Sequence, residues 1–300
     1  IMDKLISFSL PLMLSGILQL MFNAVDIIVV GRFSGKQALA AVGSTTALIN
    51  VFTNLFIGIS LGANVLAARF YAMGKSKEMS ETVHTSITLA MVSGVIMAFV
   101  GVLFARGALE LMGTPDDVID QSTLYMRIYF MGMPFFMLYN YGAAILRAIG
   151  DTKRPLLFLI ISGLINAALN MLLVIYCHMA VEGVAIATVI SQLISCILVL
   201  WCLYKSEGSY QLRFSKLQIK CVYLKQIFQV GIPAGIQSMI INFSNVLLQS
   251  SVNSFGSTAM AGYTAANNIL GFLYAAVNSI TQACMSFTSQ NYGVGKYKRM

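Results

Sequence analysis

The feature that most constrains this chain is a series of apolar runs, each long enough to cross a lipid bilayer. A membrane-spanning helix needs about 20 predominantly apolar residues. Each run is continuous, whereas a membrane-spanning strand alternates apolar and polar residues. The sequence therefore predicts an all-α membrane protein, a polytopic bundle of eight helices. The expected helices cover residues 5–31, 38–68, 84–105, 122–146, 155–177, 181–204, 225–252 and 259–292.

The composition agrees with a membrane protein. Hydrophobic residues make up 58% of the 300 residues and charged residues only 10%, with a mean hydropathy of +0.79. An ordinary soluble domain is about 25% charged. Amide side chains interrupt the runs at 38–68 and 259–292, as is typical of helices that face a bundle interior rather than lipid.

Positive charge is distributed unevenly between the two ends of the expected helices. If the amino terminus is cytoplasmic, every Lys and Arg lies on the cytoplasmic side except Arg32, Lys36, Arg106 and Arg127. Membrane proteins concentrate Lys and Arg in their cytoplasmic loops. The pattern predicts a multi-pass protein of the cytoplasmic (inner) membrane, with its amino terminus in the cytoplasm. We also expect the protein to be surrounded by membrane lipids and to be monomeric. It also accounts for the net charge of +8, so we expect no nucleic-acid partner.

The cysteine and histidine content argues against a metal site. The five cysteines show no CxxC or other metal-ligand spacing. His84 and His178 fall on opposite sides of the membrane in the expected topology. A membrane-embedded enzyme would need clustered nucleophiles, histidines or carboxylates at depth. We therefore expect no metal, no cofactor and no enzymatic activity.

The chain contains an internal repeat. The segment FSLPLMLSGILQLMFN, from Phe8, resembles VGIPAGIQSMIINFSN, from Val230, at an offset of 222 residues. The segment YAMGKSKEM, from Tyr71, resembles YGVGKYKRM, from Tyr292, at an offset of 221. Chance similarity between apolar helices accounts for the first match, but poorly for the ordered charged residues of the second. Duplication is therefore the favoured interpretation.

The repeat divides the chain into three parts. Residues 1–204 form a complete six-helix lobe, 205–224 a basic cytoplasmic linker, and 225–300 the first two helices of an incomplete second lobe. A complete protein would hold about twelve helices, so we expect the chain to be truncated after about two thirds of that length. Transporters built from repeats bind substrate between the repeats.

A polar stripe runs along the first expected helix. Ser15, Gln19, Asn23 and Asp26 follow at spacings of four, four and three residues, which places them on one helix face. A carboxylate that faces lipid costs about 2.5 to 3.5 kcal/mol, so Asp26 should face the bundle interior or a wet cavity. The alternative is an aspartate at the outer interface, which its short side chain and the stripe disfavour.

Other expected helices carry matching polar groups. Ser162, Asn166 and Asn170 recur every four residues, and Thr188 and Gln192 share a face of the next helix. Interhelical hydrogen bonding with no role in transport is an equally good interpretation of any one of them. The helix at 225–252 has a polar interior, formed by Gln237, Asn242 and Asn245, but has Leu248 where the first helix has Asp26.

Several segments, in order, resemble the multidrug and toxic compound extrusion (MATE) family. They are NAVDIIVVGRF, ALAAVGSTTALINVF, YGAAILRAIGDTKRP, NAALNMLLVI and GVAIATVISQ. The resemblance covers the whole chain. It implies a V-shaped pair of six-helix lobes that exports organic, often cationic compounds in exchange for protons or sodium ions, by alternating access between the lobes.

The resemblance also assigns ion coupling to individual residues. Asp26, Asn166 and Thr188 match the polar positions of the amino-terminal lobe in proton-coupled members of the family. At Asn170 many of those members carry a second acid, in an N-x-x-L-D-P pattern where this chain reads NAALNM. The coupling site expected here, Asp26 with Asn166, Asn170 and Thr188, therefore has one carboxylate where two are often found.

Coupling requires a group that changes charge and a helix that responds. Asp26 can be protonated and deprotonated reversibly when it is exposed alternately to two compartments. Pro11, and Pro233 at the matching place, are expected hinges, because a proline removes a backbone donor from its helix. The expected substrate cavity is lined by Gln19, Asn23, Tyr125, Tyr129, Gln192, Gln237, Asn242 and Asn245.

One rival transport function remains open at this point, and a second is disfavoured. A lipid-linked saccharide flippase of related architecture would show clustered Arg or Lys in the central cavity, and Arg127 alone is a weak match. A channel would need a filter loop or a ring of charge, and the sequence shows neither. The favoured prediction is an efflux antiporter for small organic molecules.

Overall fold

The computed structural model describes residues 2–253 and 257–299 and is helical throughout, with no strand in that part of the chain. This confirms the predicted all-α class. The α-helices are α1 (Met2–Phe33), α2 (Gly35–Ala72), α3 (Ser76–Leu111), α4 (Asp116–Met131), α5 (Met133–Ala148), α6 (Lys153–Asn170), α7 (Val181–Lys205), α8 (Cys221–Asn253) and α9 (Ser257–Gly293). Short turns of π-helix (Met171–Tyr176) and 3₁₀-helix (Phe214–Lys216 and Tyr297–Arg299) follow α6, α7 and α9.

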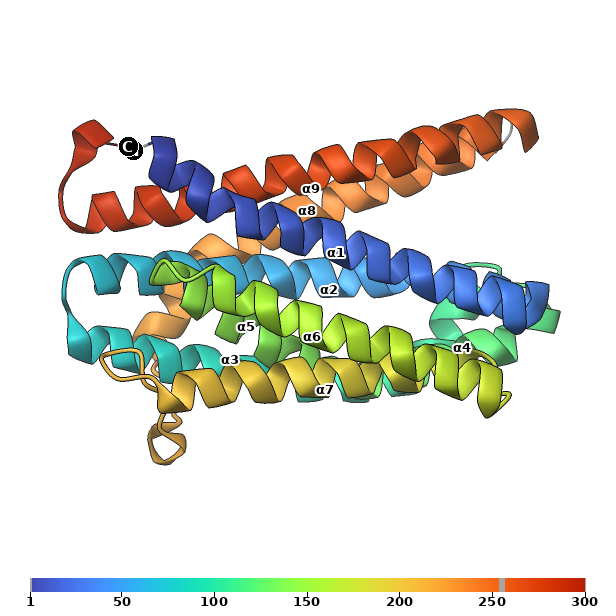
Figure 1. Ribbon diagram of the computed structural model, residues 1–300, viewed down its shortest axis with the longest axis horizontal. Helices are drawn as coiled ribbons and strands as arrows, with labels where there is room; N and C mark the ends of the chain where they lie inside the picture. Colours follow the sequence, from blue (N-terminus) through green and yellow to red (C-terminus); the bar gives the residue numbers. More distant parts are fainter. Residues whose placement is uncertain (1, 254–256, 300) are drawn as a thin grey trace.

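Five helices within the described residues are long and apolar enough to cross a membrane. They are α1, α2, α3, α6 together with its π-helical extension, and α7. The helices α8 and α9 contain 33 and 37 residues. The termini, the α2–α3 and α5–α6 turns and the linker before α8 gather at one end of the bundle, which we call the basic end (left in Figure 1).

The single helix expected over residues 122–146 is wrong, because the chain forms two helices there. Proline at 134 has no N–H to continue the hydrogen-bond ladder, and α4 ends at Met131. The break also lets Pro134 approach α3, since a Cβ added to Gly94 would lie 2.5 Å from the Pro134 Cα. The break thus fixes where α5 packs.

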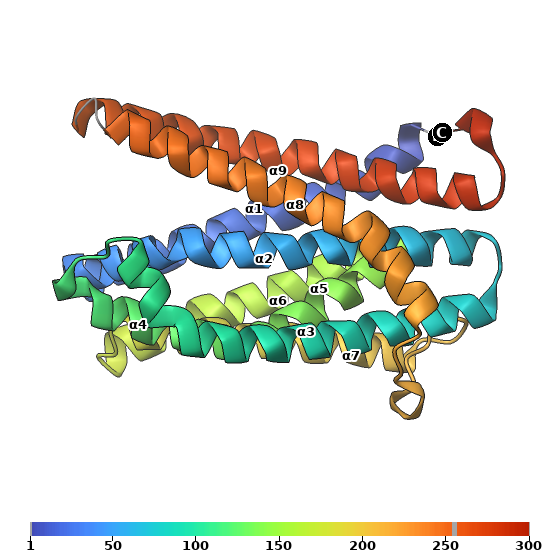
Figure 2. The same cartoon turned by 180° about the vertical axis from the view of Figure 1, so that it is seen from behind.

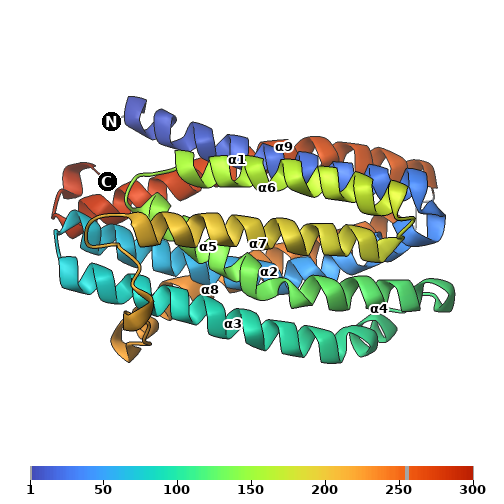
Figure 3. The ribbon, with the colours of Figure 1, turned by 60° about the horizontal axis from the view of Figure 1, so that its bottom comes forward.

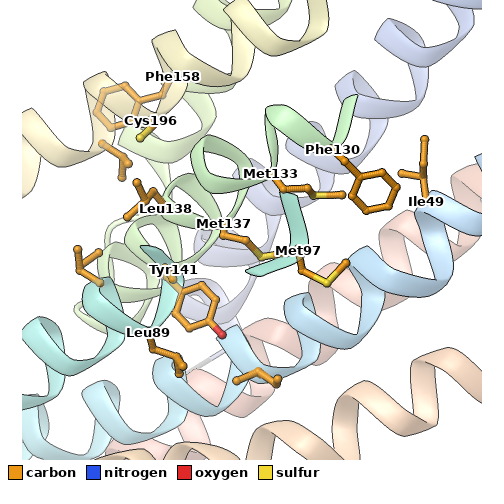
Figure 4. Packing of buried hydrophobic residues seen from close by; sticks show 14 of the residues in the cluster. Ile49, Leu89, Met97, Phe130, Met133, Met137, Leu138, Tyr141, Phe158 and Cys196 are labelled. Atoms are coloured by element: carbon orange, nitrogen blue, oxygen red, sulfur yellow. The ribbon is translucent and has the colours of Figure 1, made fainter. Parts of the chain in front are cut away.

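The core of the amino-terminal lobe lies around α5. Met133, Met137 and Tyr141 are spaced four residues apart and lie along one face of this helix, fully buried (Figure 4). Phe130, at the end of α4, inserts its ring against Gly101 of α3, where no side chain interferes. Flexible methionines fill irregular space between crossing helices well. The lobe is therefore a packed scaffold on which the polar residues are held.

The linker between α7 and α8 is attached to α3. The backbone N–H of Arg213 donates to Nε2 of His84 at 3.0 Å, and the N–H of Lys220 donates to Oγ1 of Thr85 at 3.3 Å. His84 is buried, and its Nδ1 lies 2.6 Å from the Ser80 carbonyl oxygen. Both ring nitrogens are thereby satisfied, so His84 serves as an anchor for the linker.

The two copies of the repeat pack with their helices exchanged. Helix α1 packs along α9, and α8 packs along α2 (Figures 1 and 2). Because α8 matches α1 and α9 matches α2, this is the pairing expected from a rotation that exchanges the copies. Within the amino-terminal lobe, α6 lies beside α7 and contacts α1 (Figure 3). Away from the basic end, the α8–α9 hairpin diverges from α1 and α2, which gives the V shape (Figure 1).

Candidate functional site

The carboxylate of Asp26 lies between α1 and α6. Nδ2 of Asn170, at the end of α6, donates a short hydrogen bond to Oδ1 of Asp26. Asn170 is fully buried and Asp26 is partly buried. Close packing of the two helices makes this contact possible, since the ring of Phe22 occupies the space above Gly163, where a Cβ would collide with it.

The hydrogen bonds continue from Asn170 to the next helix. Nδ2 of Asn170 also donates to Oδ1 of Asn166 at 3.2 Å, and Nδ2 of Asn166 lies 3.5 Å from Oγ1 of Thr188. Thr188 in turn donates to the Val184 carbonyl of α7 at 2.9 Å. The structure thus brings together all four residues expected at the coupling site, in one continuous series of hydrogen bonds that joins α1, α6 and α7. Their role in coupling stays a prediction.

This network contains oxygen atoms with unused capacity. Oδ1 of Asn170 is buried and accepts no hydrogen bond from the described residues. Carboxylate, amide and hydroxyl oxygens are the ligands that hard cations prefer. Within the described residues, no group of three or more His, Cys, Asp or Glu side chains is placed to hold a metal ion. The oxygen atoms around Asp26 can therefore accept a proton or lie beside a cation.

The expected tyrosine pair lies in the same lobe. The rings of Tyr125 and Tyr129 are 6.2 Å apart with an interplanar angle of 31°, and Tyr125 is buried. Gln192 of α7 packs against Gly132, at the α4–α5 break. None of these three side chains lines the cavity between the lobes.

A polar cavity of about 430 Å³ lies between the lobes. Gln19 and Asn23 of α1 line it, as the sequence predicted, and Asn278 and Gln282 of α9 lie across from them. Arg147, in the last turn of α5, also lines this cavity. We call it the interlobe cavity.

The expected cavity residues of α8 lie elsewhere. Gln237 and Asn245 are exposed, and Asn242 donates to the Ser238 carbonyl of its own helix at 2.8 Å. None of the three lines the interlobe cavity. Helix α9, rather than α8, packs against α1 and faces this cavity. Whether the three α8 residues contact substrate in the whole protein stays a prediction.

The expected hinge prolines also occupy unequal places. Pro11 is buried within α1, and Pro233 is exposed within α8. The Pro11 carbonyl accepts a hydrogen bond from Oγ of Ser15 at 2.8 Å. Helix α8 changes direction along its length (Figure 2). Whether either proline acts as a hinge stays a prediction.

Hydrogen bonds close the lobes against one another toward the basic end. Asn64 of α2 donates to the Ala144 carbonyl of α5 at 2.8 Å and accepts from Oγ of Ser286 of α9 at 3.0 Å. Nε2 of Gln290, one turn further along α9, donates to the Ala148 carbonyl at 2.8 Å. These bonds join α9 to the first lobe where the V is closed.

The sequence prediction missed two of these residues. Arg147 was counted as a loop residue because the expected helix stopped at 146, whereas α5 continues to Ala148. Asn64 was noted only as an amide that interrupts an apolar run. The signal for it was its isolation, since a lone amide in an apolar helix needs a partner.

The fold and the site together define a class of protein. A membrane bundle of paired repeats, with a partly buried carboxylate in one lobe and a polar cavity between the lobes, has the architecture of a secondary transporter. A sequence model of the MatE family matches residues 11–172 and 233–300. The chain belongs to this family. The two matched segments begin at Pro11 and Pro233, which is the spacing of the internal repeat.

Relatives and solved structures agree with the family. The chain is 32% identical to the probable multidrug resistance protein YoeA of Bacillus subtilis, over 98% of this chain and 65% of that protein. It is 26% identical to the probable multidrug resistance protein NorM of Thermotoga maritima, over 98% of this chain and 64% of that protein. The chain thus spans about two thirds of the length of these relatives.

The fold is also that of a solved transporter structure. A structure described as the outward-facing conformation of a multidrug resistance MATE family transporter of the MOP superfamily matches with a TM-score of 0.90. The match has 22% sequence identity and covers 97% of this chain and 64% of that one. The likeness confirms the predicted MATE fold.

Proposed function

We propose that the whole protein is a secondary active antiporter, which exports small organic compounds across the cytoplasmic membrane in exchange for protons or sodium ions. The observation that carries the proposal is the Asp26 network, a single carboxylate held by amides at the edge of a cavity between two lobes. The names of the relatives support multidrug export. The resemblance of this chain to the MATE family favours cationic drugs among the substrates.

The coupling step follows from the two charge states of Asp26. The ionised carboxylate accepts the N–H of Asn170 and can hold a cation beside it. The protonated carboxyl gains an O–H donor and loses its charge, so its best partner becomes an acceptor rather than a donor. Amide groups such as Asn170 offer either, because rotating the amide exchanges its nitrogen and oxygen. Protonation therefore changes how α1 is bound to α6.

Alternating access requires the closed end of the V to open. We place the basic end in the cytoplasm, because positive residues flank membrane helices on that side. The lobes diverge away from this end, so the described conformation opens to the outside (Figure 1). Opening to the cytoplasm would break the bonds of Asn64 and Gln290 to α5. Movement of α1 against α9 is the step that links a change in the protonation of Asp26 to the breaking of these hydrogen bonds.

Efflux from vesicles tests the function. The full-length protein, as a monomer in proteoliposomes, should expel a fluorescent organic compound when a pH gradient or a sodium gradient is imposed, one at a time. Dependence on one gradient identifies the coupling ion. Efflux that needs neither gradient would contradict the antiporter. A flippase would instead move a lipid-linked saccharide, for which the described interlobe cavity lacks a cluster of basic residues.

A further inference from the structure

The interlobe cavity contains a charge that the Asp26 network does not use. Arg147 lies in this cavity with the neutral amides of Gln19, Asn23, Asn278 and Gln282. No carboxylate lines the cavity among the residues that the structure describes. The cavity is therefore positive, although the expected substrates are often cations.

The guanidinium of Arg147 makes no ion pair and no side-chain hydrogen bond in the described part of the chain. Arg154, seven residues later at the basic end, is instead exposed and pairs with Asp151 at 3.2 Å. A charged residue inside a membrane bundle is costly and marks a substrate or ion pathway.

The position of Arg147 in its helix explains why the charge is tolerated. It stands in the last turn of α5, where the carbonyl dipoles favour a positive charge. That interaction leaves most of the five N–H donors of the guanidinium without an acceptor. The carboxylate of Asp26 does not supply one, because none of the ion pairs among the described residues joins it to Arg147.

We propose that Arg147 forms an anion subsite of the interlobe cavity, which binds a carboxylate or phosphate group of the exported compound. The proposal rests on the proposed transport function. A guanidinium binds either group through two parallel hydrogen bonds. The amides of Gln19 and Gln282 can donate to the same group, and the exposed ring of Tyr274 can stack on the organic body. Organic acids and zwitterions are therefore substrates that this cavity selects.

A pair of dyes of similar shape and opposite charge tests the subsite. Fluorescein is anionic and rhodamine 123 is cationic, and both contain a xanthene ring. We expect the purified full-length protein to bind fluorescein at least about tenfold more tightly than Arg147→Gln does, the range of one charge-assisted hydrogen bond. Rhodamine 123 should bind the variant as well as the wild type or better. Arg147→Lys, which keeps the charge but loses the paired donors, should fall between them for fluorescein.

The control is Arg154→Gln, which removes an exposed arginine outside the cavity and should leave the binding of both dyes unchanged. Unchanged fluorescein binding in Arg147→Gln, or an equal loss for both dyes, would overturn the subsite. If neither Arg147 variant folds, competition between the dyes on the wild type decides, and a preference for rhodamine 123 would sink the proposal. Binding needs no gradient, so failed efflux of both dyes counts against the antiporter and leaves the Arg147 result intact.

Discussion

The two crossings that join the lobes occupy matching places in the repeat, but they are built differently. At the α2–α8 crossing, glycines allow backbone to meet backbone. A Cβ added to Gly58 would lie 2.3 Å from the Gly235 Cα, and one added to Gly62 would lie 2.2 Å from the Ile227 carbonyl oxygen. Small residues four apart allow such close approach of membrane helices. This crossing is tight along its length.

The α1–α9 crossing has side chains at the corresponding positions. By the repeat offset of 221 residues, Ser279 and Ala283 of α9 are the counterparts of Gly58 and Gly62 of α2. Only 11% of the apolar window of α1 is buried, compared with 56% for α2. In the described chain, α1, which carries Asp26, is thus less enclosed by other helices than α2. The comparison teaches that duplication supplied two similar joints, of which one is fixed by contact between backbones. We expect the other, the α1–α9 joint, to respond to ion binding.

The largest expected effect comes from changing the responsive joint. Asp26→Asn should abolish gradient-driven export, because asparagine keeps the size of aspartate but cannot take up or release a proton. Substrate binding should survive if the carboxylate serves coupling alone, and weaken by about 1.5 to 3 kcal/mol if it pairs with a cationic substrate. Efflux and binding are measured on one purified variant.

The matched control for this change lies in the second copy. Leu248 occupies the place of Asp26 in α8 and is exposed, so Leu248→Ala should leave export nearly unchanged. Full efflux from Asp26→Asn under either gradient would show that the carboxylate is structural, and that the two joints do not differ in coupling.

The next effect comes from the fixed joint. Gly62→Ala forces a Cβ to within 2.2 Å of a backbone oxygen, and such overpacking costs about 1 to 3 kcal/mol. The variant should show a lower melting temperature in detergent. Gly43→Ala is the control on the same helix, because a Cβ at Gly43 meets nothing within 4 Å. Equal stability of the two variants would mean that the α2–α8 crossing is not tightly fixed.

An effect of similar size is expected from the bonds that close the V. Asn64→Leu removes the bonds to the Ala144 carbonyl and to Ser286, at about 1 to 3 kcal/mol because the remaining buried carbonyl loses its donor. A double-mutant cycle with Ser286→Ala should give a coupling of about 0.5 to 1.5 kcal/mol. Asn54→Leu, on the same helix, breaks only a local bond to the Asn50 carbonyl. Additive effects of the first pair would argue against a closing contact.

The smallest effect is expected at the prolines, and it should differ between the two helices. Pro11→Ala restores a backbone donor to α1 and should slow export several-fold by stiffening the responsive helix. Pro233→Ala makes the same change in α8, whose crossing with α2 is fixed by glycine, and should change the rate less. Stopped-flow efflux rates compare the two. Equal slowing would mean that both joints bend during transport.

The sequence by itself determined the class of fold and most of the Asp26 network. Continuous apolar runs of bilayer length have only one stable form, because backbone groups in lipid must bond within a helix. A lone carboxylate at depth needs polar partners, so Asp26, Asn166, Asn170 and Thr188 could be grouped from helical spacing and the family resemblance. Each of these requirements can be recognised within the sequence of a single helix.

Only the tertiary structure decided what faces the space between the lobes. Helical periodicity gives the face of a residue but not the helix that lies opposite, so the sequence did not show that α9 lines the interlobe cavity opposite α1. The same reason hid Arg147, whose charge matters because no carboxylate of the described residues reaches it. The tertiary structure also decided which joint is fixed, since a glycine allows close approach only where another backbone crosses it.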